Sequence, residues 1–204
     1  MKLKKSNNKN KLILILGAPV AGKSTISSLL AHKLGIRHII DTDILRNVKA
    51  IHNPENKYIN SFSFLCWKHF GKRPTKKAVL KGYKTYSQQV ISELRGIINI
   101  NNSLGRTVII EGVHLHPSLL KDVFKKENVY PIVINVDSTE HKRNIKLRVK
   151  ASFNHDPKLY LDNFEAIRII NNYLLEYSQK NGFQVFQNSN MKTVINEIIT
   201  AVSS

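Results

Sequence analysis

A short apolar run, a glycine-containing loop and a helical pattern follow one another near the start of this sequence. Residues 12–16 are all Leu or Ile, which predicts a buried strand, and the helical pattern covers residues 26–34. The loop between them has the spacing G-x-x-x-x-G-K-S, which in a strand–loop–helix context is typical of a phosphate-binding loop. The alternative is a chance glycine turn, and the agreement of all three segments argues against it.

Each residue type in this loop has a chemical role toward phosphate. Gly17 and Gly22 allow the backbone N–H groups to point inward, and the start of the helix adds its positive end. We expect Lys23 to reach the β- and γ-phosphates of ATP as a catalytic residue, and Ser24 to place its hydroxyl on Mg²⁺. The residues predicted to bind the nucleotide are Gly17, Ala18, Pro19, Val20, Ala21, Gly22, Lys23, Ser24 and Thr25.

The charge balance indicates an anionic substrate or partner. The 204 residues include 32 Lys and Arg against 14 Asp and Glu, a formal net charge of +18. A nucleic acid is one candidate partner, and a Lys/Asn-rich composition set by genomic base bias is the alternative. The single cysteine, Cys66, forms no internal disulfide, which favours a reducing, cytoplasmic location. No apolar run has the length of a membrane span, and the oligomeric state stays open.

Strands that alternate with helices predict the α/β fold class. We expect a parallel-sheet P-loop NTPase fold of the nucleoside-monophosphate-kinase-like kind, with a helical substrate cover and a lid. Residues 1–10 are predicted to form a disordered basic tail, and 11–204 a single kinase domain with a helical substrate-binding insertion at about 50–100. Strands are predicted at 12–16, 37–40, 107–111, 131–136 and 183–186, and helices at 23–34, 44–49, 76–98, 117–126, 139–151, 158–180 and 191–202.

Three carboxylates follow predicted strands and therefore share the sheet edge with the loop. We expect Asp41 to hold Mg²⁺ directly or through water. Asp43 is expected to accept the proton of an attacking hydroxyl, and it also suits the N-cap of the next helix. Glu111 lies where a carboxylate reaches the metal or the acceptor, and a structural ion pair is its alternative.

Basic residues are expected to neutralise the transferred phosphoryl group. Arg46, one helical turn after Asp43, is predicted to hold an anionic group of the acceptor, with an Asp43–Arg46 ion pair as the alternative. The cationic helix at 139–151 is either a lid or a solvated face, and we favour the lid, with Arg143 catalytic and Arg148 on the nucleotide. His114 is predicted to contact the acceptor, and its neighbours lack the spacing of a zinc site.

Three segments give the chain a family resemblance. The loop together with Gly-Ile-Arg-His-Ile-Ile-Asp-Thr-Asp43 and Arg46 resembles the archaeal-type 2-phosphoglycerate kinase family. The same holds for Val-Ile-Ile-Glu111-Gly-Val-His114-Leu-His-Pro117 and for the segment from Tyr160 to Tyr173. The resemblance implies ATP-dependent phosphorylation of a small phosphorylated hydroxy acid, giving 2,3-bisphosphoglycerate.

Two other functions are compatible with the residues. Asp43 and Arg46 also resemble the Asp-x-x-Arg of polynucleotide 5′-hydroxyl kinases, and a net charge of +18 suits such a substrate. Phe62, Phe64 and Trp67 are the residues that would stack on a base. The non-enzymatic alternative is a nucleotide-gated, nucleic-acid-binding protein, for which Asp43 and Arg46 are dispensable.

Overall fold

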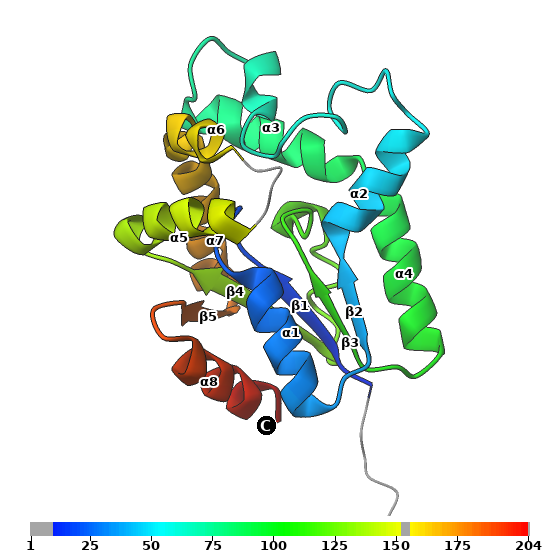
Figure 1. Cartoon of the computed structure of the whole chain (residues 1–204). Coiled ribbons are helices and arrows are strands. Elements are labelled where there is room, and N and C mark those ends of the chain that lie inside the picture. The colour runs from blue at the N-terminus through cyan, green and yellow to red at the C-terminus, as the bar shows by residue number, and fades with distance from the viewer. Residues whose placement is uncertain (1–9, 152–155, 204) are drawn as a thin grey trace, which may run out of the picture.

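A five-stranded, all-parallel sheet forms the centre of the molecule, in the order β2-β3-β1-β4-β5 (Figure 1). The computed structural model describes residues 10–151 and 156–203, so the tail expected at 1–10 lies outside them apart from its last residue. The predicted parallel α/β fold is confirmed, and β1 lies in the middle because its five residues are all buried. The strands are β1 Leu12–Leu16, β2 His38–Asp41, β3 Val108–Glu111, β4 Val129–Asn135 and β5 Gln184–Gln187.

Helices cover both faces of the sheet, because a parallel sheet exposes an apolar surface on each side. Alternate residues of β1 enter two separate cores: Leu12 and Leu14 pack toward α3, α4 and α7, and Ile13 and Ile15 toward α1 and α8. The helices are α1 Lys23–Leu34, α2 Thr42–Ile51, α3 Lys76–Gln88, α4 Ile91–Ser103, α5 Ser138–Ala151, α6 Pro157–Asp162, α7 Phe164–Asn181 and α8 Met191–Ser203, with the 3₁₀ turns η1 Cys66–His69 and η2 Pro117–Leu119.

Two helices that the pattern predicts as continuous are each broken in two. The helix predicted at 76–98 ends at Gln88 and restarts at Ile91, with the fully buried Val90 between them. The break lets α3 pack on η1 and α7 while α4 packs on α2, so tertiary contacts override local propensity. The helix predicted at 158–180 breaks at Asn163, whose side-chain amide donates to the Leu159 carbonyl (2.9 Å).

The helix predicted at 117–126 is reduced to the single 3₁₀ turn η2. A helical continuation would need the Leu119 carbonyl as an acceptor for an N–H four residues later. In the structure this carbonyl accepts a hydrogen bond from Arg95 of α4 (2.8 Å), and the same guanidinium pairs with Asp122 (2.7 Å). The contact with α4 therefore replaces the helical hydrogen bond.

The segment from residue 52 to 74 covers the carboxyl ends of the strands together with α3 and α6 (Figure 1). This segment, part of the predicted helical insertion, contains the short 3₁₀ helix η1. Its Cys66 and Trp67 are buried in the core, and burial raises the pKa of the Cys66 thiol to about 11, as suits an inert buried cysteine. Within the described residues, no helix is long and apolar enough to cross a membrane.

Candidate active site

The loop after β1 has the backbone geometry that the motif predicts. Gly22 has φ 94°, and a Cβ there would lie 2.4 Å from the Asn188 side-chain amide, so a side chain has no room. Val20 also has a positive φ, 62°. In the described part of the chain no side chain caps the start of α1, which leaves its first N–H groups free for an anion. The Lys23 ammonium donates to the Ala18 carbonyl (3.1 Å), folded back over the loop.

A buried histidine of α5 forms a hydrogen bond with this loop and holds it in place. His141, at the start of α5, has no exposed surface, and its Nε2 lies 2.7 Å from the Pro19 carbonyl. Its Nδ1 lies 3.3 Å from Arg168 of α7, and Arg168 donates to the Val136 carbonyl (2.7 Å). Burial lowers the pKa of His141 to about 4, so the neutral ring donates from Nε2 and accepts at Nδ1. Loop, α5 and α7 are thereby joined.

Two cavities meet at the loop. One, of about 290 Å³, runs along the start of α1 and reaches Asn144, Asn188 and Met191. The other, of about 280 Å³, lies between the loop and the cover. Four residues line both cavities: Val20, Lys23, Ser24 and Arg148. The second cavity is also lined by residues from the neighbouring strand ends and the cover, among them Asp41, Asp43, Arg46, Phe62, Phe64, Tyr86, Glu111 and Tyr160.

The turn from β2 into α2 orients Asp43. Asp41 is the N-cap of α2 and accepts from the Asp43 N–H (2.8 Å), so the capping role considered for Asp43 belongs to Asp41. The Asp43 side chain is 52% exposed and lines the second cavity. Behind it His114 has no exposed surface, lies 3.7 Å from the Asp43 carboxylate and 3.0 Å from the Thr42 hydroxyl, and stacks on Tyr86. His114 is thus beside Asp43 and not on the cavity wall.

Glycine is required where this turn meets β3. Gly112 has φ 145°, and a Cβ there would lie 1.8 Å from the Thr42 hydroxyl. The close approach lets Thr42 reach His114. Burial, helped by Arg46 and Lys23, lowers the pKa of His114 to about 3, so the ring is neutral beside Asp43.

The two remaining carboxylates lie closer to the loop. Glu111 is 3% exposed, and burial raises its pKa while Lys23 and a hydrogen bond to the Ser24 hydroxyl oppose that shift. Burial also raises the pKa of Asp41. Hydroxyl and carboxylate oxygens are the ligands that Mg²⁺ prefers, and it keeps several waters, so this set fits the ion. Within residues 10–151 and 156–203, no group of three or more His, Cys, Asp or Glu is arranged to enclose a metal.

The structure separates the predicted arginines. Arg46 lines the second cavity, donates to the Ile59 carbonyl (3.5 Å) and leaves its buried Nε without a partner; the described residues form no Asp43–Arg46 ion pair. Arg148 lines both cavities. Arg143 is 68% exposed, lies 3.3 Å from Glu140 and lines a different surface groove. Arg148, predicted to bind the nucleotide, therefore lies beside the loop, whereas Arg143, predicted to be catalytic, lies away from it.

Several residues of the site are not predicted from the sequence. Asn188 follows β5 at the same sheet edge and donates to the Ala21 carbonyl of the loop (2.9 Å), so the rule that ligands lie beyond strand carboxyl ends points to it. Asn144 has no motif around it, and only the structure shows that this residue of α5 lines the first cavity. His141 gives no signal in the sequence, because a single histidine in a basic helix is usually solvated.

The fold and the loop together define the class as a P-loop kinase fold. Deoxyadenosine kinase from M. mycoides has a TM-score of 0.55 at 20% identity over 96% of this chain and 100% of that one. Shikimate kinase from Acinetobacter baumannii also has a TM-score of 0.55, at 13% identity over 95% of this chain and 93% of that one.

The sequence itself is similar to 2-phosphoglycerate kinases, so the predicted resemblance is confirmed. The enzyme of Methanopyrus kandleri is 31% identical over 95% of this chain, and that of Methanocaldococcus jannaschii 32% identical over 94%. The chain spans 61% and 63% of the length of these two relatives. No protein-family model matches the chain.

Proposed function

We propose that this chain is an ATP-dependent kinase that phosphorylates a hydroxyl of a small phosphorylated acid, 2-phosphoglycerate in the first place. One observation carries the proposal: the two cavities share Lys23, Ser24 and Arg148. ATP in the first cavity then has its γ-phosphate at the junction, and an acceptor in the second has its hydroxyl in line with it.

The reaction needs few groups from the protein. The acceptor hydroxyl oxygen bonds to the γ-phosphorus, the bond from phosphorus to the bridging oxygen of ADP breaks, and Asp43 takes the hydroxyl proton. Lys23 and Arg148 offset the charge on the moving phosphoryl group. Ser24 and Asp41, with Glu111 behind them, would hold Mg²⁺, which supplies electrostatic stabilisation of the phosphate oxygens when bound.

The second cavity, which we call the acceptor cavity, suits a small anion. Its volume is about 280 Å³, and Arg46 and Arg148 supply two guanidinium groups for a phosphate or a carboxylate. The insertion at about 50–100 covers this cavity with Phe62 and Phe64. The names of the relatives in Methanopyrus kandleri and Methanocaldococcus jannaschii support 2-phosphoglycerate.

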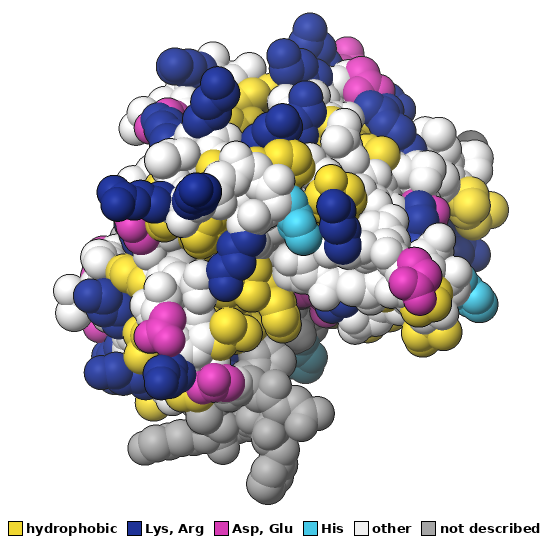
Figure 2. Space-filling model, turned by 90° about the horizontal axis from the view of Figure 1, so that it is seen from above, with side chains coloured by type: hydrophobic (Ala, Val, Ile, Leu, Met, Phe, Trp, Pro, Cys, Tyr) yellow, Lys and Arg dark blue, Asp and Glu magenta, His cyan; other side chains and the backbone are white. Residues whose placement is uncertain are grey.

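Polynucleotide 5′-hydroxyl kinase activity is the second candidate, and the surface of the cover favours it. Figure 2 shows Lys and Arg side chains spread over the face seen from above the cover. Residues 57–92, which form much of this cover, contain no Asp or Glu. Such a surface favours a phosphate backbone through counterion release.

A transfer assay with γ-labelled ATP separates these functions. The panel holds 2-phosphoglycerate, glycerate, and RNA and DNA with 5′-hydroxyl ends. We expect label on 2-phosphoglycerate and much less on glycerate, because Arg46 then lacks its phosphate partner. Label on an oligonucleotide alone would favour the polynucleotide kinase. ATP consumed with no label transferred would favour a nucleotide-gated binding protein.

A further inference from the structure

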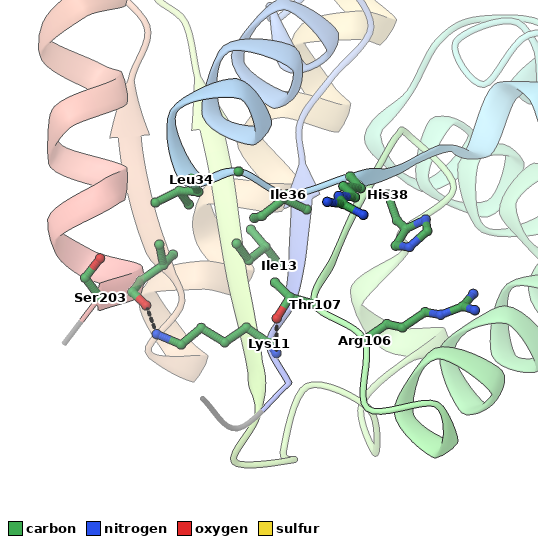
Figure 3. Close-up of a pocket in the computed structure, with 11 residues that line it drawn as sticks. Lys11, Ile13, Leu34, Ile36, His38, Arg106, Thr107 and Ser203 are labelled. Carbon is green, nitrogen blue, oxygen red and sulfur yellow. Dashed lines mark hydrogen bonds between the residues drawn. The ribbon is translucent and has the colours of Figure 1, made fainter. Parts of the chain in front are cut away.

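A third pocket, with a different chemistry, lies at the opposite edge of the sheet, where the strands begin (Figure 3). Its volume is about 450 Å³, and it is bounded by the end of α1, the starts of β1 and β3, and the end of α8. The length of β1, roughly 15 Å at about 3.3 Å per residue, separates it from the phosphate loop. It is therefore independent of the proposed kinase site.

The pocket has an apolar middle and a cationic rim. Ile13, Leu34 and Ile36 lie between its two ends, with His38 and Arg106 at one end in Figure 3. Lys11 reaches the other end, where its ammonium donates to the Val202 carbonyl and so neutralises the end of α8. Among the residues that the structure describes, no Asp or Glu lines the pocket.

Three basic residues of the rim, Arg37, His38 and Arg106, lie where adjacent strands begin. His38 and Val108 pair in the parallel register as the first residues of β2 and β3, so Arg37 and Thr107 directly precede these neighbouring strands, and Arg106 precedes Thr107. The Arg106 backbone N–H donates to the Asn101 carbonyl (3.0 Å), but within the described residues the side chains of Arg37, His38 and Arg106 make no hydrogen bond, ion pair or ring contact. The two arginine side chains are positively charged, and an anion bound between them offsets both charges.

We propose that this pocket binds a small organic phosphate with a planar or apolar body, the chemistry of a nucleoside monophosphate. The phosphate lies between the Arg37 and Arg106 guanidinium groups, which match it bidentately, and the body lies on Ile13, Leu34 and Ile36.

Calorimetric titration of the whole chain with AMP tests the proposal. Excess Mg²⁺ and a non-hydrolysable ATP analogue fill the phosphate loop first. We expect saturable AMP binding that is weakened about tenfold or more in Arg37→Ala and in Arg106→Ala, because each removes a charge-assisted contact. Both side chains are exposed, so both variants should keep the wild-type melting temperature.

Two control variants and two fragments of AMP test whether binding depends on this pocket and on both parts of the ligand. Arg73→Ala removes an exposed arginine of the cover, and Arg46→Ala removes the one in the acceptor cavity; AMP binding should survive both. Adenosine and inorganic phosphate should each bind more weakly than AMP. The proposal is overturned if no saturable binding occurs, if Arg46→Ala abolishes it while Arg37→Ala does not, if Arg73→Ala weakens it equally, or if phosphate binds as tightly as AMP.

Discussion

Asp43 differs from the two carboxylates beside it in exposure and orientation. Glu111 is buried and Asp41 caps α2, whereas the Asp43 side chain is half exposed in the acceptor cavity with neutral His114 behind it. We therefore expect Asp43→Asn to lower kcat by about 10²–10⁴-fold, since the amide cannot take the proton, while ATP binding is nearly unchanged. Steady-state transfer and nucleotide titration measure the two effects.

Asp162→Asn is the matched control for this variant. Asp162 is exposed at the end of α6 and lines neither cavity. Its variant should keep the wild-type kcat. Wild-type turnover in Asp43→Asn would refute the role of base, and loss of ATP binding in that variant would show a structural role instead.

Arg148 and Arg143 form a second natural comparison, because both lie on α5 but face different surfaces. Arg148 lines both cavities, and Arg143 pairs with Glu140 in solvent. Arg148→Ala should reduce kcat by at least about 10²-fold, the loss expected when one charge-stabilising donor is removed. Arg143→Ala should stay within about twofold of wild type, as exposed ion pairs contribute little. Equal losses in the two variants would contradict this assignment.

For the helices and strands, the sequence pattern predicts the type of each element better than the residues at which it begins and ends. β1 and α1 have the predicted bounds because a fully apolar run and a glycine at each end of the helix leave few alternatives. The breaks at Val90 and Asn163 and the short η2 depend on which neighbour each segment contacts. Periodicity within one segment carries no information about those neighbours.

The connection between α5, α7 and the loop gives a prediction at this scale. His141→Ala removes the hydrogen bonds to Pro19 and Arg168, so the loop loses its brace and Arg168 loses an acceptor. We expect a stability loss of about 1–3 kcal/mol and a KM for ATP that rises several-fold more than the KM for the acceptor. Steady-state kinetics in both substrates and urea unfolding measure these changes.

Conservative and unrelated variants separate positioning from simple loss of stability. His141→Gln keeps an amide donor within reach of the Pro19 carbonyl and should recover part of the ATP affinity. His116→Ala removes another buried histidine, one packed on Tyr83 away from the loop. It should lose stability without a specific change in the KM for ATP. The same ratio of the KM for ATP to the KM for the acceptor in both alanine variants would contradict a role of His141 in positioning the loop.

The site as a whole is assembled from the ends of β1, β2, β3 and β5 with α5 and the cover. The sequence predicts the contributions of the first three strands, because the loop and carboxylates follow recognisable strands. It fails where a side chain is selected by the packing of whole helices. Arg148 and Arg143 are the same residue type on the same predicted helix, and only the folded structure shows that Arg148 lines the cavity while Arg143 pairs with Glu140.

Three buried histidines make the stability of the whole molecule dependent on pH. Burial holds the pKa of His114 and His116 at about 3 and that of His141 at about 4, below the 6.5 of an exposed ring. Between these values the unfolded chain binds protons that the folded chain does not. Stability is therefore full above about pH 6.5 and falls as the pH drops, by up to about 1.4 kcal/mol per pH unit for each histidine.

Urea unfolding at pH 7.5, 6 and 5 should show this slope, and His116→Gln should isolate one part of it. The raised pKa values of Asp41 and Glu111 act in the opposite direction, but their effect is shared by variant and wild type and cancels in the difference. His116→Gln should be less stable at pH 7.5, with a slope below pH 6 that is shallower by about 1.4 kcal/mol per unit. His52→Gln, at an exposed site, should leave the slope unchanged. Equal slopes in all three proteins would mean that His116 is protonated in the folded state, which requires an open path from solvent to its ring.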